Sequence, residues 1–319
     1  MDYMPQNIAS YGGEIDQLTW LITAITFVCL VIAEGFLLVA AFRFRRGANR
    51  KARYITGEAW KQARYVLIPV LLIVALDFYI DIKNAHAWTE IKQTLPTSGM
   101  QVGITAEQFL WTFSYPGEDT RLGTSDDLTS DELHIPVGTN VTYQLQAKDV
   151  LHSLWIPAMR LKQDALPGRT EKGWMQATEM GTFDIACAEI CGEGHSKMAA
   201  RLVVQNRDEY QQWLHQLKAG GKERSPEELM RVKGCFGCHS LDGTPLVGPT
   251  YKGLFGRQET VITDKAERVI EVDEAYLRKS ILEPNADVVK KFPPAMPDLS
   301  DKLSPEEVDQ IVNFLKTVK

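Results

Sequence analysis

The sequence has few cysteines and no excess of positive charge. Its formal net charge is -6, which argues against a nucleic-acid partner because proteins that bind nucleic acid present a basic face. The 319 residues include five cysteines, and all but Cys29 fall in two motifs with other chemical roles. A disulfide scaffold is therefore not expected, and cysteine usage alone does not fix the cellular compartment.

The N-terminal region lacks the features of a cleavable signal peptide. Acidic Glu14 and Asp16, rather than a basic segment, precede the first apolar run, and no small-residue cleavage site follows it. That run covers about residues 18–42, and a second covers about residues 63–82. Since roughly 20 apolar residues cross a bilayer as a helix, the sequence predicts a two-helix transmembrane hairpin.

Charged residues around these runs predict their orientation in the membrane. The segment Arg43–Arg53 is dense in arginine and lysine, which marks the cytoplasmic side. Both termini and everything after about Asn84 would then lie on the outer face. Glu34 and Asp77 fall inside the runs, where a charge is costly. Glu34 either guides protons toward a partner subunit or fixes helix packing, and Asp77 either faces protein or reaches the outer interface.

Short β-rich runs separated by turn signals follow between residues 100 and 205. Strands at this regular spacing predict an all-β sandwich or barrel. Trp111 and Phe113, in an aromatic-rich run, are expected to be core residues. The predicted strands are Gln101–Ala106, Glu132–Pro136, Val141–Ala147, Thr182–Ala186 and Ala200–Gln205.

One loop concentrates sulfur and imidazole donors. It reads Cys187-Ala-Glu-Ile-Cys191-Gly-Glu-Gly-His195-Ser-Lys-Met198. These donors suit copper or zinc, and the thioether favours copper, because structural zinc sites close with four Cys or His ligands. Two cysteines in one loop can bridge two copper ions. A zinc knuckle or a disulfide hairpin is the alternative, but either would leave Met198 unexplained.

The loop needs at least one further ligand, and His152 is the best candidate. It lies in Asp149-Val-Leu-His152-Ser-Leu-Trp-Ile-Pro157, which has the pattern of a strand that ends at a proline. A single histidine in such a strand is usually a hydrogen-bonded core residue. The donor-rich loop elsewhere in the chain favours ligation instead.

A second cysteine motif lies in the C-terminal third. Cys235-Phe-Gly-Cys238-His239 is the attachment signature of c-type heme, in which two thiols add to the vinyl groups and the histidine ligates iron. A bare Cys-x-x-Cys would otherwise indicate a redox dithiol or half of a zinc site. Met296, framed by prolines, is the predicted second axial ligand, whereas a lone methionine would more often be a packing residue.

Capping motifs predict two helices in this C-terminal region. Ser225-Pro226-Glu227-Glu228 begins the first, and Ser304-Pro-Glu-Glu307 begins the second. An apolar stripe on the second helix is expected to pack into the core. The stripe consists of Val308, Ile311, Val312 and Leu315.

Three ordered motifs resemble subunit II of heme-copper cytochrome c oxidases. They are Asp149–Ser153, Leu161–Arg169 and the loop Cys187–Met198. The resemblance implies a cupredoxin-like Greek-key sandwich with a binuclear copper A centre. It also implies a magnesium or manganese ion at the boundary with subunit I, reached by the Glu189 carboxylate, with Asp164 and Arg169 nearby. The implied copper ligands are His152, Cys187, Glu189 through its backbone carbonyl, Cys191, His195 and Met198.

The chain departs from that family's pattern at two places. Phe109 and Leu110 stand where the family has the first two residues of Trp-Tyr-Trp, whose first tryptophan receives electrons from a soluble cytochrome. This departure predicts a weaker docking site for an external electron donor. Such weak docking is expected if the electron donor is already fused to the chain. Gln62 stands where the family has a glutamate at the opening of a proton channel, and Glu58, one turn earlier, is a possible substitute.

The C-terminal region resembles class I cytochrome c, an all-α fold. Gly248-Pro249 and Gly253–Gly256 carry this resemblance together with the heme motif. Fusion of such a region to an oxidase subunit II resembles the bacterial caa-type oxidases. The expected domains are a transmembrane hairpin at 1–95, a copper A domain at 96–215, a linker at 216–224 and a cytochrome c domain at 225–319.

The expected function is electron transfer at the bacterial inner membrane. Electrons from an upstream quinol-oxidising complex or a cytochrome c donor would reach the heme, then copper A, then subunit I and its associated membrane subunits. Oxygen reduction and proton pumping would occur there, because six histidines and two spans cannot build that centre here. Two alternatives stay open, a copper A subunit of a nitric oxide reductase and a membrane-tethered electron shuttle. A quinol oxidase subunit is disfavoured because that branch lacks the copper ligands.

Overall fold

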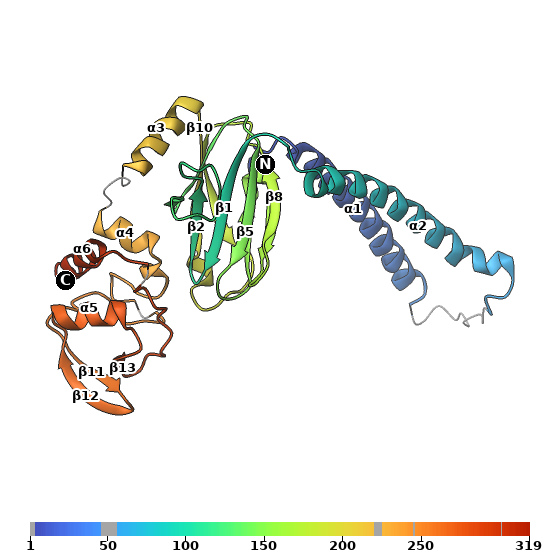
Figure 1. Cartoon of the computed structure of the whole chain (residues 1–319). Helices are drawn as coiled ribbons and strands as arrows, with labels where there is room; N and C mark the ends of the chain where they lie inside the picture. The colour runs from blue at the N-terminus through green and yellow to red at the C-terminus, as the bar shows by residue number, and fades with distance from the viewer. Residues whose placement is uncertain (1–3, 46–55, 220–224, 245, 301) are drawn as a thin grey trace. The chain divides into compact units, whose positions relative to one another are not determined.

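The computed structural model describes residues 4–45, 56–219, 225–244, 246–300 and 302–319 (Figure 1). The chain divides into a helical unit, Ala9–Thr97, and a second unit made of Met1–Ile8 and Ser98–Lys319. Most of the predicted basic segment Arg43–Arg53 and of the predicted linker lies outside the described residues.

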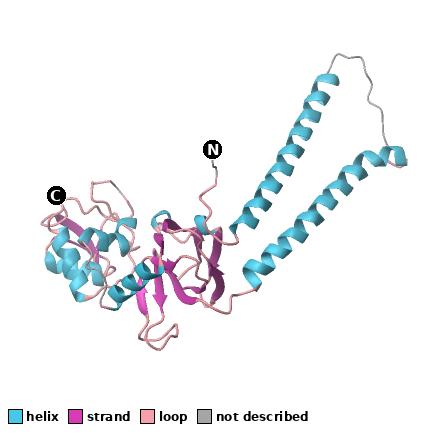
Figure 2. Cartoon of the chain, turned by 90° about the horizontal axis from the view of Figure 1, so that it is seen from above, coloured by secondary structure: helices cyan, strands magenta, loops and turns pink. Residues whose placement is uncertain are grey.

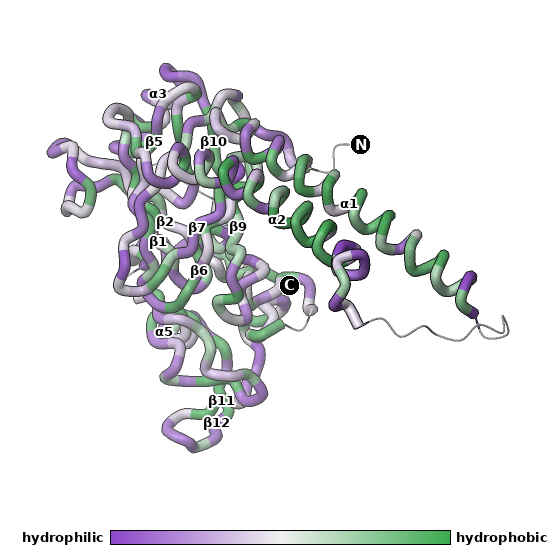
Figure 3. Tube along the Cα trace, turned by 90° about the vertical axis from the view of Figure 1, so that its right-hand side faces the viewer, coloured by the Kyte–Doolittle hydropathy of each residue, from purple (hydrophilic) through white to green (hydrophobic). Residues whose placement is uncertain are grey.

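The helical unit consists of two long apolar helices and a terminal turn. Helix α1 spans Gly12–Arg43 and α2 spans Trp60–Trp88, continued by the π-helical turn η1 at Thr89–Gln93. Both helices are long and apolar enough to cross a membrane, and both are coloured as predominantly hydrophobic in Figure 3. Their side chains are exposed almost throughout, which suits a lipid or protein environment rather than water. The prediction of two apolar N-terminal helices is confirmed.

A β-sandwich forms the first part of the second unit, and its strands are gathered in one region of the chain (Figure 2). One sheet has the order β3-β2-β1-β5-β8 and the other β4-β10-β9-β6-β7. The first sheet contains β1 Met100–Glu107, β2 Leu110–Tyr115, β3 Leu128–Ser130, β5 Val141–Ala147 and β8 Glu171–Met175. The second contains β4 Leu133–Pro136, β6 His152–Ile156, β7 Leu161–Ala165, β9 Gly181–Cys187 and β10 Ala199–Gln205.

Alternating side chains build the core of this sandwich. In β5, Val141, Tyr143 and Leu145 are buried while the residues between them are not, as the two-residue period of a strand requires. Trp111 and Phe113 in β2 are buried, which confirms their predicted core role. All five predicted strands are present, and the cupredoxin-like sandwich is confirmed.

Three short helices connect or follow the strands of the sandwich. The 3-10 helices η2 and η3 span Pro157–Met159 and His195–Lys197, and α3 spans Arg207–Lys218. Asn206 and Glu209 form a capping box at the start of α3, which the sequence analysis did not predict. Trp213 of this helix stacks on buried His134, with ring centroids 4.0 Å apart, and so holds α3 against the sandwich.

The C-terminal region is mainly helical. It contains α4 Pro226–Val232, the 3-10 turn η4 Cys235–Gly237, α5 Glu274–Leu282 and α6 Pro305–Leu315. Ser225 and Ser304 cap α4 and α6 as predicted. The helical fold is confirmed, but "all-α" is incomplete because a small sheet, β12-β11-β13, is also present. Its strands are β11 Gln258–Thr263, β12 Ala266–Glu271 and β13 Val288–Val289.

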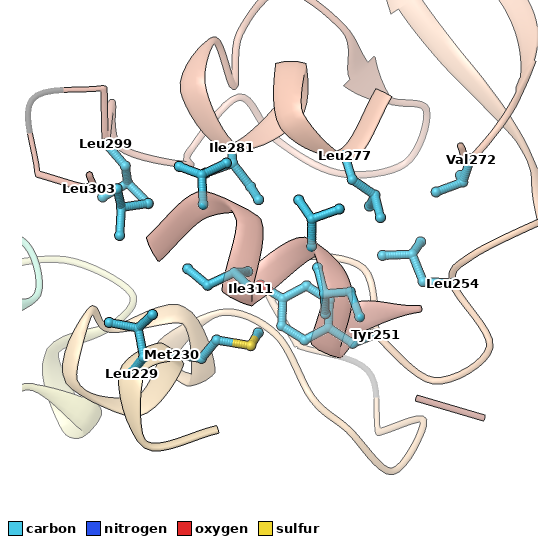
Figure 4. Packing of buried hydrophobic residues seen from close by; sticks show 13 residues of the cluster. Leu229, Met230, Tyr251, Leu254, Val272, Leu277, Ile281, Leu299, Leu303 and Ile311 are labelled. Carbon is cyan, nitrogen blue, oxygen red and sulfur yellow. The ribbon is translucent and has the colours of Figure 1, made fainter. Parts of the chain in front are cut away.

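One apolar cluster holds the helices of this region together (Figure 4). It brings Leu229 and Met230 of α4 against Ile311 of α6, and Leu277 and Ile281 of α5 join them. All four members of the predicted stripe on α6 are buried, so their core role is confirmed. Burying an aliphatic side chain of this size contributes about 1.5–3 kcal/mol, so the cluster stabilises the packing of these helices.

Candidate metal and heme centres

Strand pairing brings the predicted copper ligands together from two parts of the chain. His152 is the first residue of β6 and Cys187 the last of β9, and the two strands pair with Leu154 opposite Cys187. The backbone nitrogen of Cys187 donates to the carbonyl of Met198 at 3.1 Å, which closes the loop. The sheet therefore fixes both ends of the donor set.

The ligating atoms of this set lie close together and are mostly buried. The Cys191 sulfur lies 3.8 Å from the Cys187 sulfur, 3.8 Å from the Met198 sulfur and 3.7 Å from His195 Nδ1. Ligating atoms of His152, Cys187 and Cys191 all lie within 4.8 Å of one another. A sulfur separation of 3.8 Å is far longer than a disulfide bond of about 2.05 Å, which argues against the disulfide-hairpin alternative.

The chemistry of these residues fits a metal. The His152 side chain is fully buried, and its Nε2 atom is hydrogen-bonded to Asp149 at 2.8 Å, which leaves Nδ1 for the sulfur donors. A thiol is only a weak hydrogen-bond partner for a buried ring nitrogen, and a metal bond would satisfy that nitrogen better. Metal-binding histidines commonly direct their other nitrogen at a carboxylate in this way.

The two cysteines also indicate a cation. Burial and the adjacent Cys187 sulfur raise the pKa of Cys191. Burial acts in the same direction on Cys187, but hydrogen bonds from His152 and from backbone amides outweigh it and lower the pKa of that thiol. Two thiolates this close repel each other unless positive charge lies between them. With a thioether and imidazoles added, the donor set suits copper better than zinc.

Glu189 has two predicted roles: its backbone carbonyl as a copper ligand and its carboxylate as a ligand of a magnesium or manganese ion. Its backbone carbonyl lies 3.2 Å from the Cys187 sulfur, so it faces the donor set. Asp164 accepts hydrogen bonds from Ser153 and Lys162, and Arg169 pairs with Glu171. The magnesium or manganese role of the Glu189 carboxylate stays a prediction.

The heme motif borders a cavity in the helical region. The turn η4 carries Cys235, and His239 follows it with Nδ1 hydrogen-bonded to the carbonyl of Pro249 at 2.7 Å. This contact leaves Nε2 as the free ligating atom, and the ring also stacks on Tyr251 at 4.6 Å. Burial lowers the pKa of His239, which favours the neutral imidazole that iron requires.

Two spaces beside the heme motif share His239 and Met296 as lining residues. The first is lined mainly by apolar residues of the core cluster, and the second is lined by Cys238 and the prolines around Met296. Apolar walls with a few placed polar groups are typical of cofactor sites in proteins. The residues therefore fit a heme attached at Cys235 and Cys238 with His239 and Met296 as axial ligands, which stay predicted ligands.

Gly248 explains part of the local sequence of the heme site. A Cβ atom at this position would lie 2.6 Å from His239 Cε1, so a larger residue would displace the imidazole. The glycine is needed because the backbone passes directly over the ring.

The predicted proton-path residues lie on the helical unit. Glu34 and Asp77 are exposed on α1 and α2. Gln62 accepts a hydrogen bond from the backbone of Gly57, so it stabilises the start of α2. Which of these residues or Glu58 serves protons stays a prediction.

Sequence reasoning missed one residue that touches the copper loop. The Gln108 side chain donates to the carbonyl of Cys191 at 2.5 Å, across 83 positions of sequence. A lone glutamine beside an aromatic run gives no signal for such a contact. Its neighbour Phe109 packs its ring against Gly192 and Gly194 of the loop.

The fold and these donor sets define a class. This is a chain with two apolar helices, a cupredoxin-like domain with a soft metal site, and a cytochrome c domain. Residues 108–206 match the family model for the periplasmic domain of cytochrome c oxidase subunit II, and residues 227–319 match that for cytochrome c.

Known proteins extend the match over most of the chain. Cytochrome c oxidase subunit 2 of Alkalihalophilus pseudofirmus is 31% identical, covering 91% of this chain and 82% of that protein. The subunit 2 of Bacillus subtilis is 26% identical, covering 97% and 90%. The solved periplasmic domain of subunit II from Bradyrhizobium japonicum is 26% identical over 40% of this chain and all (100%) of that one, with a TM-score of 0.35.

The chain belongs to the cytochrome c oxidase subunit 2 family and carries a C-terminal cytochrome c domain. It is thus a subunit of a heme-copper oxidase with a subunit I partner, as predicted. Its helices and its family make it membrane-anchored with a periplasmic domain. Membership implies copper A and heme as cofactors.

Proposed function

We propose that this chain is the subunit through which electrons enter a bacterial caa-type oxidase. Its heme and binuclear copper A, when bound, supply the one-electron redox chemistry, and subunit I reduces oxygen to water with proton pumping. The observation that carries the proposal is the presence, in one chain, of a close sulfur and imidazole cluster and a cavity flanked by a heme-attachment motif.

Each group of residues has a defined task in this proposal. Cys235 and Cys238 attach the porphyrin covalently, so the donor cannot dissociate from the oxidase. His239, oriented by Pro249, and Met296 would hold the heme iron, and a His/Met ligand pair would favour a high reduction potential.

The sheet would hold the copper ligands in fixed positions. His152 and Cys187 sit on paired strands, and the loop that follows is closed by the contact between Cys187 and Met198. Ligands fixed by a sheet change little when the charge of the site changes, so the energy needed to reorganise the site is small.

The membrane arrangement completes the proposal. Both helices would cross the inner membrane with both termini and both redox domains on the outer face, beside subunit I and other membrane subunits. The upstream donor would be a quinol-oxidising complex or a cytochrome c. Glu189 would also reach a magnesium or manganese ion at the subunit I boundary.

The test is to purify the complex and measure its metals and the gas it consumes. Two copper atoms and one covalent heme in this chain, with oxygen consumption by the complex, would support the proposal. Reduction of nitric oxide in place of oxygen would favour a nitric oxide reductase. Isolation of the metal-loaded chain without a large membrane subunit would favour an electron shuttle.

A further inference from the structure

Gln108 contacts the copper site on two sides. Its side-chain nitrogen donates to the carbonyl of Cys191 at 2.5 Å, and its backbone nitrogen donates to Asp149 Oδ2 at 2.7 Å. The other carboxylate oxygen of Asp149 bonds to His152 Nε2 at 2.8 Å. One residue thus links the copper loop to the histidine that comes from a different strand.

The space around Gln108 shows how closely it fits the loop. A Cβ atom at Gly192 would lie 2.8 Å from the side-chain nitrogen Nε2 of Gln108 and 2.9 Å from Phe109 Cζ. A Cβ atom at Gly194 would lie 2.3 Å from the Phe109 ring. The loop between Cys191 and His195 therefore carries glycine at both points where the pair Gln108 and Phe109 presses against it.

Asp149 needs a second contact to hold its orientation. Its side chain is 32% exposed, so water competes for its oxygens and burial alone does not fix it. The backbone amides of Gln108 and Val150 each donate to it at 2.7 Å. Together they hold the carboxylate in the position where it meets the His152 ring.

We infer that Gln108 is a positioning residue of the copper centre. It keeps Cys191 and His152 in a fixed relation by bonding to the loop directly and to the histidine through Asp149. This inference rests on the proposed function, because it assumes that these residues bind copper. Outer residues that orient metal ligands typically change metal affinity by roughly 10–100-fold when they are replaced.

The experiment uses the intact complex and two variants of the glutamine. Gln108→Ala removes the side chain, and Gln108→Glu keeps its shape but replaces the donor with a carboxylate that repels the Cys191 carbonyl. Both variants keep the backbone N–H that binds Asp149, so they test the side-chain bond to the loop. Gln146→Ala is the matched control, because Gln146 is an exposed glutamine of β5, the strand beside β1, and its contact is with Thr105 at 3.4 Å. Hydrogen-exchange protection of the sandwich strands reports whether the copper domain of each variant is folded.

We expect both Gln108 variants to bind copper about 10–100-fold more weakly than the wild type in competition with a copper(I) chelator. We also expect a changed copper hyperfine pattern and a shifted copper reduction potential, which general loss of stability would not produce. The control should match the wild type in all three measurements.

Two results would overturn the inference. In one, both variants keep the wild-type copper affinity, hyperfine pattern and potential. In the other, Gln108→Glu behaves as wild type while Gln108→Ala does not, which would show that shape rather than hydrogen bonding matters. A wild-type complex without a copper pair would instead refute the proposed function.

Discussion

The two redox sites of this chain are built in opposite ways. At the copper site, donor atoms from paired strands already lie within 4.8 Å of one another, so metal ions complete an arrangement that the sheet sets. At the proposed heme site, His239 and Met296 line a space whose walls are mainly apolar side chains of the core cluster. A porphyrin would therefore be part of the hydrophobic core, whereas copper would add little to it.

This difference predicts which of the two domains needs its cofactor in order to fold. A ligand that binds only the native state stabilises it, and the effect is largest where the ligand replaces core contacts. The helical region should depend on heme, and the sandwich should survive without copper.

Removal of the heme attachment should have the largest effect. In Cys235→Ser/Cys238→Ser we expect loss of the covalent heme spectrum and of cooperative unfolding of residues 225–319, because apolar walls would be left without their partner. Cys187→Ser is the comparison, and it should lose the copper signal while the sandwich stays folded. Hydrogen exchange would measure both, and equal protection of the helical region in the two variants would contradict the account.

Deletion of the chain from Ser225 onward should have the next largest effect. The truncated oxidase should load copper normally but lose most of its turnover with the natural donor, because the family resemblance implies that Phe109 stands where other members have a tryptophan that serves a soluble cytochrome. Oxygen uptake with the natural donor measures this. Undiminished turnover would mean that the fused heme is not the donor.

Replacement of single thioethers should give smaller and separable effects. Met296→Leu should remove the low-spin His/Met features of the heme and leave the copper spectrum unchanged. Met198→Leu should shift the copper signal and potential and leave the heme spectrum unchanged. If either substitution altered both spectra, the assignment of ligands to the two sites would be wrong.

The smallest effect concerns a buried carboxylate beside the heme cavity. Burial alone would raise the pKa of Asp287, but hydrogen bonds from Arg268, Lys279 and Thr263 outweigh it and hold the pKa well below its usual value of 3.8. A lowered folded-state pKa stabilises the protein above the unfolded value and this contribution is lost as the pH falls below it.

Asp287→Asn should therefore lower the free energy of unfolding of the heme-loaded region by about 1–3 kcal/mol at pH 7. Its cationic partners are partly exposed, which keeps the expected loss modest. The difference from wild type should shrink as the pH falls below about 4. Denaturant unfolding at several pH values measures it, and a difference that grows in acid would contradict this assignment.

Features carried by continuous motifs could be predicted from the sequence. The copper loop, the heme motif and the caps at Ser225 and Ser304 each depend on neighbouring residues. The two caps are confirmed, and the ligand roles in the two motifs stay predictions. The capping box that starts α3 at Asn206 is a local signal of the same kind and could have been found.

Other features could not be predicted because their signal is not local. The hairpin of β11 and β12 turns at Asp264 and Lys265, both with positive φ, where the usual Asn-Gly or Asp-Gly signal is absent. Its strands also lack clear alternation of buried and exposed residues. Gln108 contacts Cys191 only because the sandwich brings β1 beside the loop.

The most direct test of the central claim is paramagnetic resonance combined with metal analysis of the purified, full-length protein. The account predicts two copper atoms for each covalently bound heme iron, with a signal in which one unpaired electron is shared between both copper ions. A single copper or zinc atom per chain, with no signal from a copper pair, would contradict it.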